Sequence, residues 1–126
     1  MMKRHLAILL WAADPDHPHL CSVPFFHAAA AAAMDVEVEI YFTSRSVRLL
    51  ARGVADDLYP GPARERSVRE YMGHALEHGV KFFACSQSMA AHGVAAESLL
   101  PEVAGQAGAA AFVGRCMDDD WATLVY

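Results

Sequence analysis

Strand-like and helix-like segments alternate along the whole chain, and this order limits the possible folds more than any other feature of the sequence. Residues 5–11 (HLAILLW) form a continuous apolar run of strand length, as expected for a central strand of a parallel sheet. Residues 80–84 (VKFFA) and 121–126 predict two further strands. Residues 36–42 (VEVEIYF) alternate apolar and acidic side chains, which predicts a strand at the edge of the sheet.

Helices are expected between these strands. The apolar side chains of residues 63–78 recur at the spacing of one helix face, and Gly79 is placed to end that helix. Further helices are expected over residues 22–34, 44–53, 86–92 and 103–117. This order predicts an α/β fold of three layers, in which helices flank a mostly parallel sheet. Because 126 residues are too few for two separate cores, residues 1–126 are expected to form a single domain.

The composition excludes several classes of protein. The chain is 55% hydrophobic and 20% charged, which is typical of a folded globular domain. Its net charge is −5 and it has no run of lysine or arginine, so a nucleic-acid partner is not expected. The alanine run of residues 28–33 is too short to cross a bilayer, so no membrane partner is expected either. The mean hydropathy of +0.19 is high for a small monomer and favours association between subunits.

Three cysteines, Cys21, Cys85 and Cys116, lie far apart in the sequence. They form no CxxC pair, so they predict neither a disulfide framework nor a structural zinc site, and no metal or cofactor is expected. Free thiols favour a reducing compartment, and we therefore predict a cytoplasmic protein. Residues 1–13 faintly resemble a signal peptide, but cleavage would remove the first predicted core strand.

Cys85 is the strongest candidate for chemistry. It directly follows the strand of residues 80–84, and open α/β sheets bind their ligands at the carboxyl ends of the strands. If a helix begins at Ser86, its first N–H groups favour a thiolate or a persulfide anion over a neutral thiol. The hydroxyls of Ser86 and Ser88 are candidates for additional donors. The alternative is a buried cysteine that packs as a small apolar side chain.

The loop of residues 12–21 is a second candidate. We expect the first and third strands to be neighbours, in which case Cys21 approaches Cys85 as a partner thiol. His17 and His19 would then hold a proton or a positive charge nearby, although a solvated loop explains the same residues. The alternating positions of His17, His19 and Cys21 also suggest a metal- or small-ligand-binding module with Cys85 as a further ligand.

Three other features are expected to be structural. Cys116 is expected to pack in the core from the last helix. His74 and His78 share a helix face, but no third ligand completes a metal site, so both are expected at the surface. Gly105 and Gly108 do not follow a strand with the spacing of a phosphate-binding loop.

Residues 78–94 (HGVKFFACSQSMAAHGV) resemble the signature region of the DsrE/DsrF-like family. In that region a helix ends in glycine, a hydrophobic strand follows, and a cysteine opens a short helix that ends in another glycine. The order of elements agrees over nearly the whole chain, and the resemblance is specific around Cys85.

This resemblance implies a flavodoxin-like fold and assembly into homotrimers or hexamers. It also implies a sulfur-relay function in which Cys85 accepts sulfane sulfur as a persulfide and passes it on. The implied partners are sulfur donor and acceptor proteins or small persulfides. Whether turnover is catalytic, as in a sulfurtransferase, or stoichiometric stays open. Some family members lack the cysteine, so a non-catalytic assembly subunit is a further alternative.

Overall fold

Residues 3–126 are described by the computed structural model, and their centre is a five-stranded sheet. The strands are β1 (His5–Leu10), β2 (Glu37–Phe42), β3 (Lys81–Ala84), β4 (Gly105–Gln106) and β5 (Trp121–Val125). They lie in the order β4-β3-β2-β1-β5, and every neighbouring pair runs parallel. All carboxyl ends therefore meet at one edge of the sheet.

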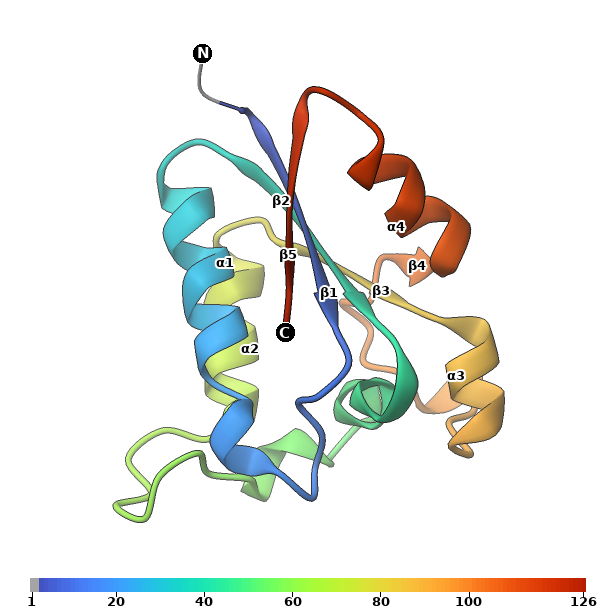
Figure 1. Ribbon diagram of the computed structural model, residues 1–126. Coiled ribbons are helices and arrows are strands. Elements are labelled where there is room, and N and C mark those ends of the chain that lie inside the picture. Colours follow the sequence, from blue (N-terminus) through green and yellow to red (C-terminus); the bar gives the residue numbers. More distant parts are fainter. Residues whose placement is uncertain (1–2) are drawn as a thin grey trace.

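Helices lie on both faces of this sheet (Figure 1). They are α1 (Val23–Ala33), α2 (Val68–Glu77), α3 (Ser86–Ala91) and α4 (Ala109–Cys116), and 3-10 turns span Pro18–Leu20, Ser44–Leu50, Ala55–Asp57 and Ala96–Ser98. α1 and α2 pack side by side on one face, and α4 lies on the other. These layers confirm the predicted α/β fold.

The alternation of side chains along β1 divides the core into two parts. Leu6, Ile8 and Leu10 join a large cluster of buried apolar side chains beneath α1 and α2. Ala7 belongs to a much smaller cluster on the α4 face. Because α4 has only eight residues, it covers this face incompletely.

The two ends of α2 are determined by local sequence. Ser67 and Glu70 form a capping box, in which the Ser67 hydroxyl accepts from the Glu70 N–H (3.1 Å) and the Glu70 carboxylate accepts from the Ser67 N–H (3.3 Å). The chain leaves the helix through Gly79, whose φ of 86° lies in the left-handed region that suits glycine. The predicted helix is confirmed, but it begins at Val68 because Ser67 caps it there.

One predicted edge strand and one predicted helix differ from the structure. β2 is not an edge strand, because it pairs with β1 on one side and β3 on the other. Its acidic Glu39 is accommodated on the α4 face by an ion pair with Arg115. The helix expected over residues 103–117 is also too long, since Gly105–Gln106 pairs with β3 as a short strand and α4 begins at Ala109.

The apolar run near the N-terminus is a core strand, as predicted, and β1 pairs with both β2 and β5. None of the helices among residues 3–126 is long and apolar enough to cross a membrane. The cytoplasmic location and the homotrimer or hexamer stay predictions.

Candidate functional site

Cys85 lies at the carboxyl end of β3, where the chain turns into α3. Its backbone N–H donates to the carbonyl oxygen of Phe42 in β2 (2.9 Å), and its carbonyl oxygen accepts from the N–H of Met89 in α3 (2.9 Å). It is the N-cap residue of α3 and keeps an extended backbone, with φ of −73° and ψ of 118°. These contacts fix the half-buried thiol between the sheet and the helix.

The thiol of Cys85 lines a cavity of about 260 Å³, which we call the Cys85 cavity. Its apolar walls come from β1, β2 and α4, and consist of Leu9, Tyr41, Phe112 and Val113. Small residues lie where β4 leads into α4. A Cβ atom at Gly108 would lie 3.4 Å from the Cys85 sulfur, so glycine keeps the space beside the sulfur open.

The pKa of the Cys85 thiol lies below its ordinary value. Burial is the largest single influence, and it raises the pKa because it disfavours the charged thiolate. It is outweighed by the hydroxyl and N–H of Ser88, the hydroxyl of Thr43 and the N–H of Gln87, which stabilise the thiolate and lower the pKa. Cys85 therefore becomes a nucleophilic thiolate at a lower pH than an ordinary cysteine.

The hydroxyl of Ser88 is oriented by the end of β2. Its Oγ accepts from the backbone N–H of Ser44 (2.7 Å) and lies 3.3 Å from Thr43 Oγ1. Because Oγ accepts from the backbone, its single hydrogen is free to point at the thiolate of Cys85. Ser44 has a φ of 54°, which is unusual for serine, and its hydrogen bond to Ser88 stabilises that conformation.

Replacing Ser88 by alanine should raise the pKa of Cys85. A hydrogen bond to a charged group contributes roughly 1.5–3 kcal/mol, so alkylation by iodoacetamide below the wild-type midpoint should slow about tenfold. The pH dependence of the alkylation rate measures this shift. Ser86→Ala is the matched control, because Ser86 is exposed and does not act on the thiolate. Equal midpoints for the two variants would contradict the role of Ser88.

Thr43 and Gly108 are the neighbours of Cys85 that sequence patterns do not reveal. Phe42 and Ala84 are register partners in β2 and β3, so the residues that follow them, Thr43 and Cys85, lie next to each other. Only the register between β2 and β3, which the structure supplies, identifies Thr43 as a neighbour of Cys85. Gly108 reaches the site only because the two-residue strand β4 precedes it, and so short a strand has no periodicity to detect.

Cys21 does not share this site. The expected adjacency of β1 and β3 is wrong, because β2 lies between them. Cys21 is fully buried at the start of α1, where its thiol donates to the carbonyl oxygens of Asp14 (3.4 Å) and His17 (3.5 Å). Burial, together with the charge of Asp14, raises the pKa of Cys21 to about 12. The thiol is therefore protonated near neutral pH and poorly suited to sulfur exchange with Cys85.

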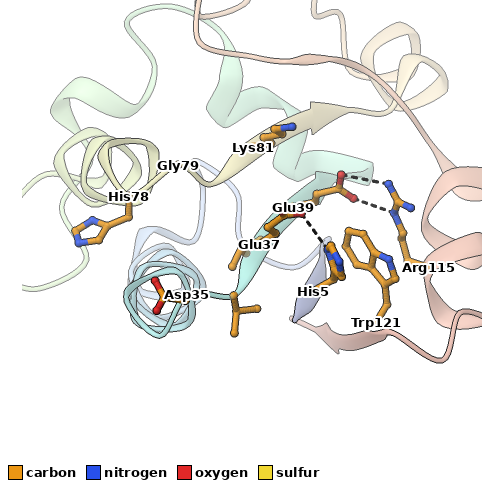
Figure 2. A pocket seen from close by; sticks show the side chains of 11 residues that line it. His5, Asp35, Glu37, Glu39, His78, Gly79, Lys81, Arg115 and Trp121 are labelled. Carbon is orange, nitrogen blue, oxygen red and sulfur yellow. Dashed lines mark hydrogen bonds and ion pairs between the residues drawn. The ribbon is translucent and has the colours of Figure 1, made fainter. Parts of the chain in front are cut away.

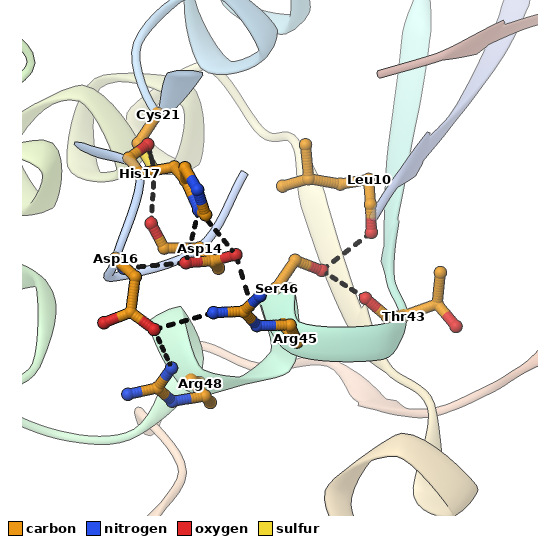
Figure 3. A network of polar contacts seen from close by, with 9 residues as sticks. All are labelled: Leu10, Asp14, Asp16, His17, Cys21, Thr43, Arg45, Ser46 and Arg48. Carbon is orange, nitrogen blue, oxygen red and sulfur yellow. Dashed lines mark hydrogen bonds and ion pairs between the residues drawn. The ribbon is translucent and has the colours of Figure 1, made fainter. Parts of the chain in front are cut away.

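A network of charged side chains instead holds the loop after β1 (Figure 3). The buried carboxylate of Asp14 accepts from the Asp16 N–H (2.7 Å), lies 3.1 Å from His17 Nδ1, and pairs with Arg45 (3.5 Å). Asp16 binds Arg45 (2.7 Å) and Arg48 (3.1 Å), which lower its pKa. The network ties this loop to the 3-10 turn after β2, whose first residue donates to Ser88.

The same loop offers no cluster of metal ligands. The ring of His17 is engaged by Asp14, His19 is exposed, and the thiol of Cys21 points into the core. Nowhere in residues 3–126 do three or more His, Cys, Asp or Glu side chains gather as a metal site would require. The metal-binding form of this alternative therefore has no cluster of ligands in the described part of the chain.

The remaining candidates lie at the surface. Ser86 opens α3 with an exposed side chain. The prediction that Cys116 packs in the core is wrong, because it is exposed at the end of α4, where Phe112 is the buried residue. His74 and His78 are exposed, as predicted.

A larger cavity of about 700 Å³ lies at the opposite edge of the sheet, at the amino ends of the strands (Figure 2). Two ion pairs, Arg115 with Glu39 and His5 with Glu37, lie in its lining. Arg115 binds Glu39 (3.0 Å) and stacks over Trp121 (4.0 Å), which in turn stacks on His5 (4.7 Å). Glu39 also accepts from the Tyr41 hydroxyl (2.7 Å). These contacts anchor α4 and the Tyr41 ring, both of which form walls of the Cys85 cavity.

Two solved structures from different organisms have a similar fold. The crystal structure of the ychN protein from E. coli has a TM-score of 0.75 at 12% identity, covering 99% of this chain and 100% of that one. MTH1491 from Methanobacterium thermoautotrophicum, a protein of unknown function, has a TM-score of 0.66 at 21% identity, covering 97% and 98%. At these identities the likeness concerns the fold alone.

Sequence comparison identifies the family. No curated protein matches the chain. The model of the DsrE/DsrF-like family matches residues 7–119, which include most of β1, all of β2 and β3, and the whole Cys85 site. The chain therefore belongs to the DsrE/DsrF-like family, which is associated in general with sulfur relay.

Proposed function

We propose that this chain is a sulfur-relay protein that carries sulfane sulfur as a persulfide on Cys85. The observation that carries the proposal is a half-buried thiol that lines an open cavity and has a lowered pKa. The thiolate is the nucleophile in sulfur exchange, and the groups that stabilise it also suit the anion of a persulfide. Family membership supports sulfur relay as the general theme.

The transfer needs neither an oxidant nor a reductant. In loading, the Cys85 thiolate attacks the terminal sulfur of a persulfide donor R–S–SH, the donor S–S bond breaks, and the donor leaves as the thiolate R–S⁻. Cys85 is then a persulfide, Cys–S–SH. In unloading, an acceptor thiolate attacks this outer sulfur and releases the Cys85 thiolate.

The acceptor thiol comes from another molecule in this proposal. Cys21 is buried with a pKa of about 12, and Cys116 is exposed on α4 without lining the Cys85 cavity. Cys85 therefore has no neighbouring thiol among the described residues to which it would pass sulfur internally. A carrier with a single reactive cysteine is suited to receive sulfur from one molecule and to pass it to another.

The test is mass spectrometry after brief exposure of the folded chain to a persulfide donor. Alkylation and digestion then locate any added sulfur. One added sulfur atom should appear on the peptide that contains Cys85, and incubation with a thiol acceptor should remove it. A chain whose Cys85 peptide stays unmodified at every donor concentration would contradict the proposed function.

A further inference from the structure

The walls of the Cys85 cavity contain no charged side chain among the residues that the structure describes. Its polar groups are neutral and lie on the sulfur side, at Thr43, Gln87 and Ser88. The opposite walls, which include Leu9 and Phe112, are apolar except for the Tyr41 hydroxyl, which donates to Glu39. One end of the cavity thus stabilises a sulfur anion, while the rest offers no partner to a charged group.

From this lining we propose that the Cys85 cavity selects compact sulfane-sulfur donors without charged substituents, and that its substrate class is short inorganic polysulfide. The proposal rests on the proposed function of Cys85 and specifies its donor. The hydroxyl and N–H groups beside Cys85 stabilise negative charge on the sulfur chain itself, so that charge does not prevent a polysulfide from binding.

The size of the cavity supports a small donor. Its volume of about 260 Å³ lies below the roughly 300–1,000 Å³ of pockets that hold drug-sized ligands. The free space includes the region beside the sulfur, because Gly108 has no side chain to fill it. A chain of two or three sulfur atoms fits lengthwise into such a space, whereas a tripeptide would leave most of its atoms outside.

The charge of larger donors adds to this selection. Glutathione persulfide carries two carboxylates and an ammonium group, and an apolar wall offers none of them a hydrogen bond or an ion pair. Desolvating a charged group without a partner is strongly unfavourable. Arg115 and Glu39, the nearest ion pair that we describe on the α4 face, are already bound to each other.

Loading from a trisulfide chain balances in the same way as loading from a persulfide. The Cys85 thiolate attacks the protonated terminal sulfur of HS–S–S⁻, and the bond to that sulfur breaks. The leaving disulfide takes the electron pair and the proton and departs as HS–S⁻, so Cys85 is left as the persulfide anion Cys–S–S⁻ beside the groups that stabilise it. No further reactant is required.

The experiment compares two donors on the full chain by intact-mass spectrometry. Initial loading rates are measured with sodium trisulfide and with glutathione persulfide. Each rate is divided by the rate of the same donor with a peptide of residues 80–92, which contains Cys85 without the cavity. Because unpaired charge is costly to bury, the normalised trisulfide rate should exceed the glutathione persulfide rate by at least about tenfold.

The outcomes separate this proposal from the function on which it rests. Equal normalised rates, or faster loading by glutathione persulfide, would overturn the donor class and leave Cys85 as a carrier. If neither donor loads Cys85, both proposals are wrong. Loading by trisulfide alone supports both.

A matched pair of variants tests whether the donor enters through the cavity. Ala109 lines the cavity at the start of α4, and Ala110, the next residue, does not. Both are exposed, and leucine is a good helix former at either position. Ala109→Leu should slow trisulfide loading several-fold relative to Ala110→Leu. Equal rates in two variants of equal helical content would overturn the cavity as the entry route.

Discussion

Cys85→Ser should abolish sulfur loading of the folded chain, whereas Cys116→Ser should load one sulfur atom as the unchanged chain does. Serine keeps the size and polarity of the residue at the N-cap of α3, so the helix and the cavity should persist. It removes the thiolate, which is the group that attacks a sulfane sulfur. The expected effect is therefore complete loss of function in a protein that stays folded.

Intact-mass spectrometry after donor exposure measures this loss, with circular dichroism as the check on folding. Cys116→Ser is the control because Cys116 is exposed but does not line the Cys85 cavity. Cys21→Ser adds a control for the buried thiol. If Cys85→Ser is labelled as fully as the wild type, sulfur is carried elsewhere and the proposed function is wrong.

Phe42→Ala should destabilise the chain by about 3–5 kcal/mol, which is the usual cost of deleting a buried aromatic ring. Phe42 is fully buried in β2, and its ring lies 6.0 Å from that of Phe25 and 5.1 Å from that of Phe82. Truncation would leave a cavity at the contact of α1 with two central strands. Total stabilities are roughly 5–15 kcal/mol, so the variant should be close to unfolding.

Denaturant unfolding at a fixed chain concentration measures this change. Phe26→Ala is the matched control, since the same side chain is deleted from the next position of α1 after Phe25, where it is 59% exposed. It should change the free energy of unfolding by less than about 1 kcal/mol. Similar losses in the two variants would contradict the packing described around Phe42.

Phe42 contributes both to the core and to the position of Cys85. The carbonyl oxygen of Phe42 accepts the N–H of Cys85, and the next residue, Thr43, lowers the pKa of the thiol. Phe42→Leu keeps an apolar side chain in the core and should be milder than alanine. If the Phe42→Leu variant folds but the pKa of its Cys85 is raised, packing at the end of β2 also positions the groups that stabilise the Cys85 thiolate.

The strands β1 and β3, the helix α2 and the place of Cys85 were determined by sequence alone. Apolar runs of strand length predicted β1 and β3, and an apolar stripe ending in glycine predicted α2, because such patterns depend on residues close together in the chain. The junction of β3 with α3 follows from the same local signals. Cys85 was therefore placed correctly at the carboxyl end of a strand.

Strand order and the surroundings of Cys85 were decided by the tertiary structure. The acidic pattern of β2 is typical of an edge strand, but pairing across the sheet depends on contacts between distant segments, which put β2 at the centre. That position separates Cys21 from Cys85 and brings Thr43 to the thiol instead. Pairing with β3 likewise makes a strand of Gly105–Gln106 and sets Gly108 beside the sulfur, because two residues acquire strand character only from the neighbour to which they bond.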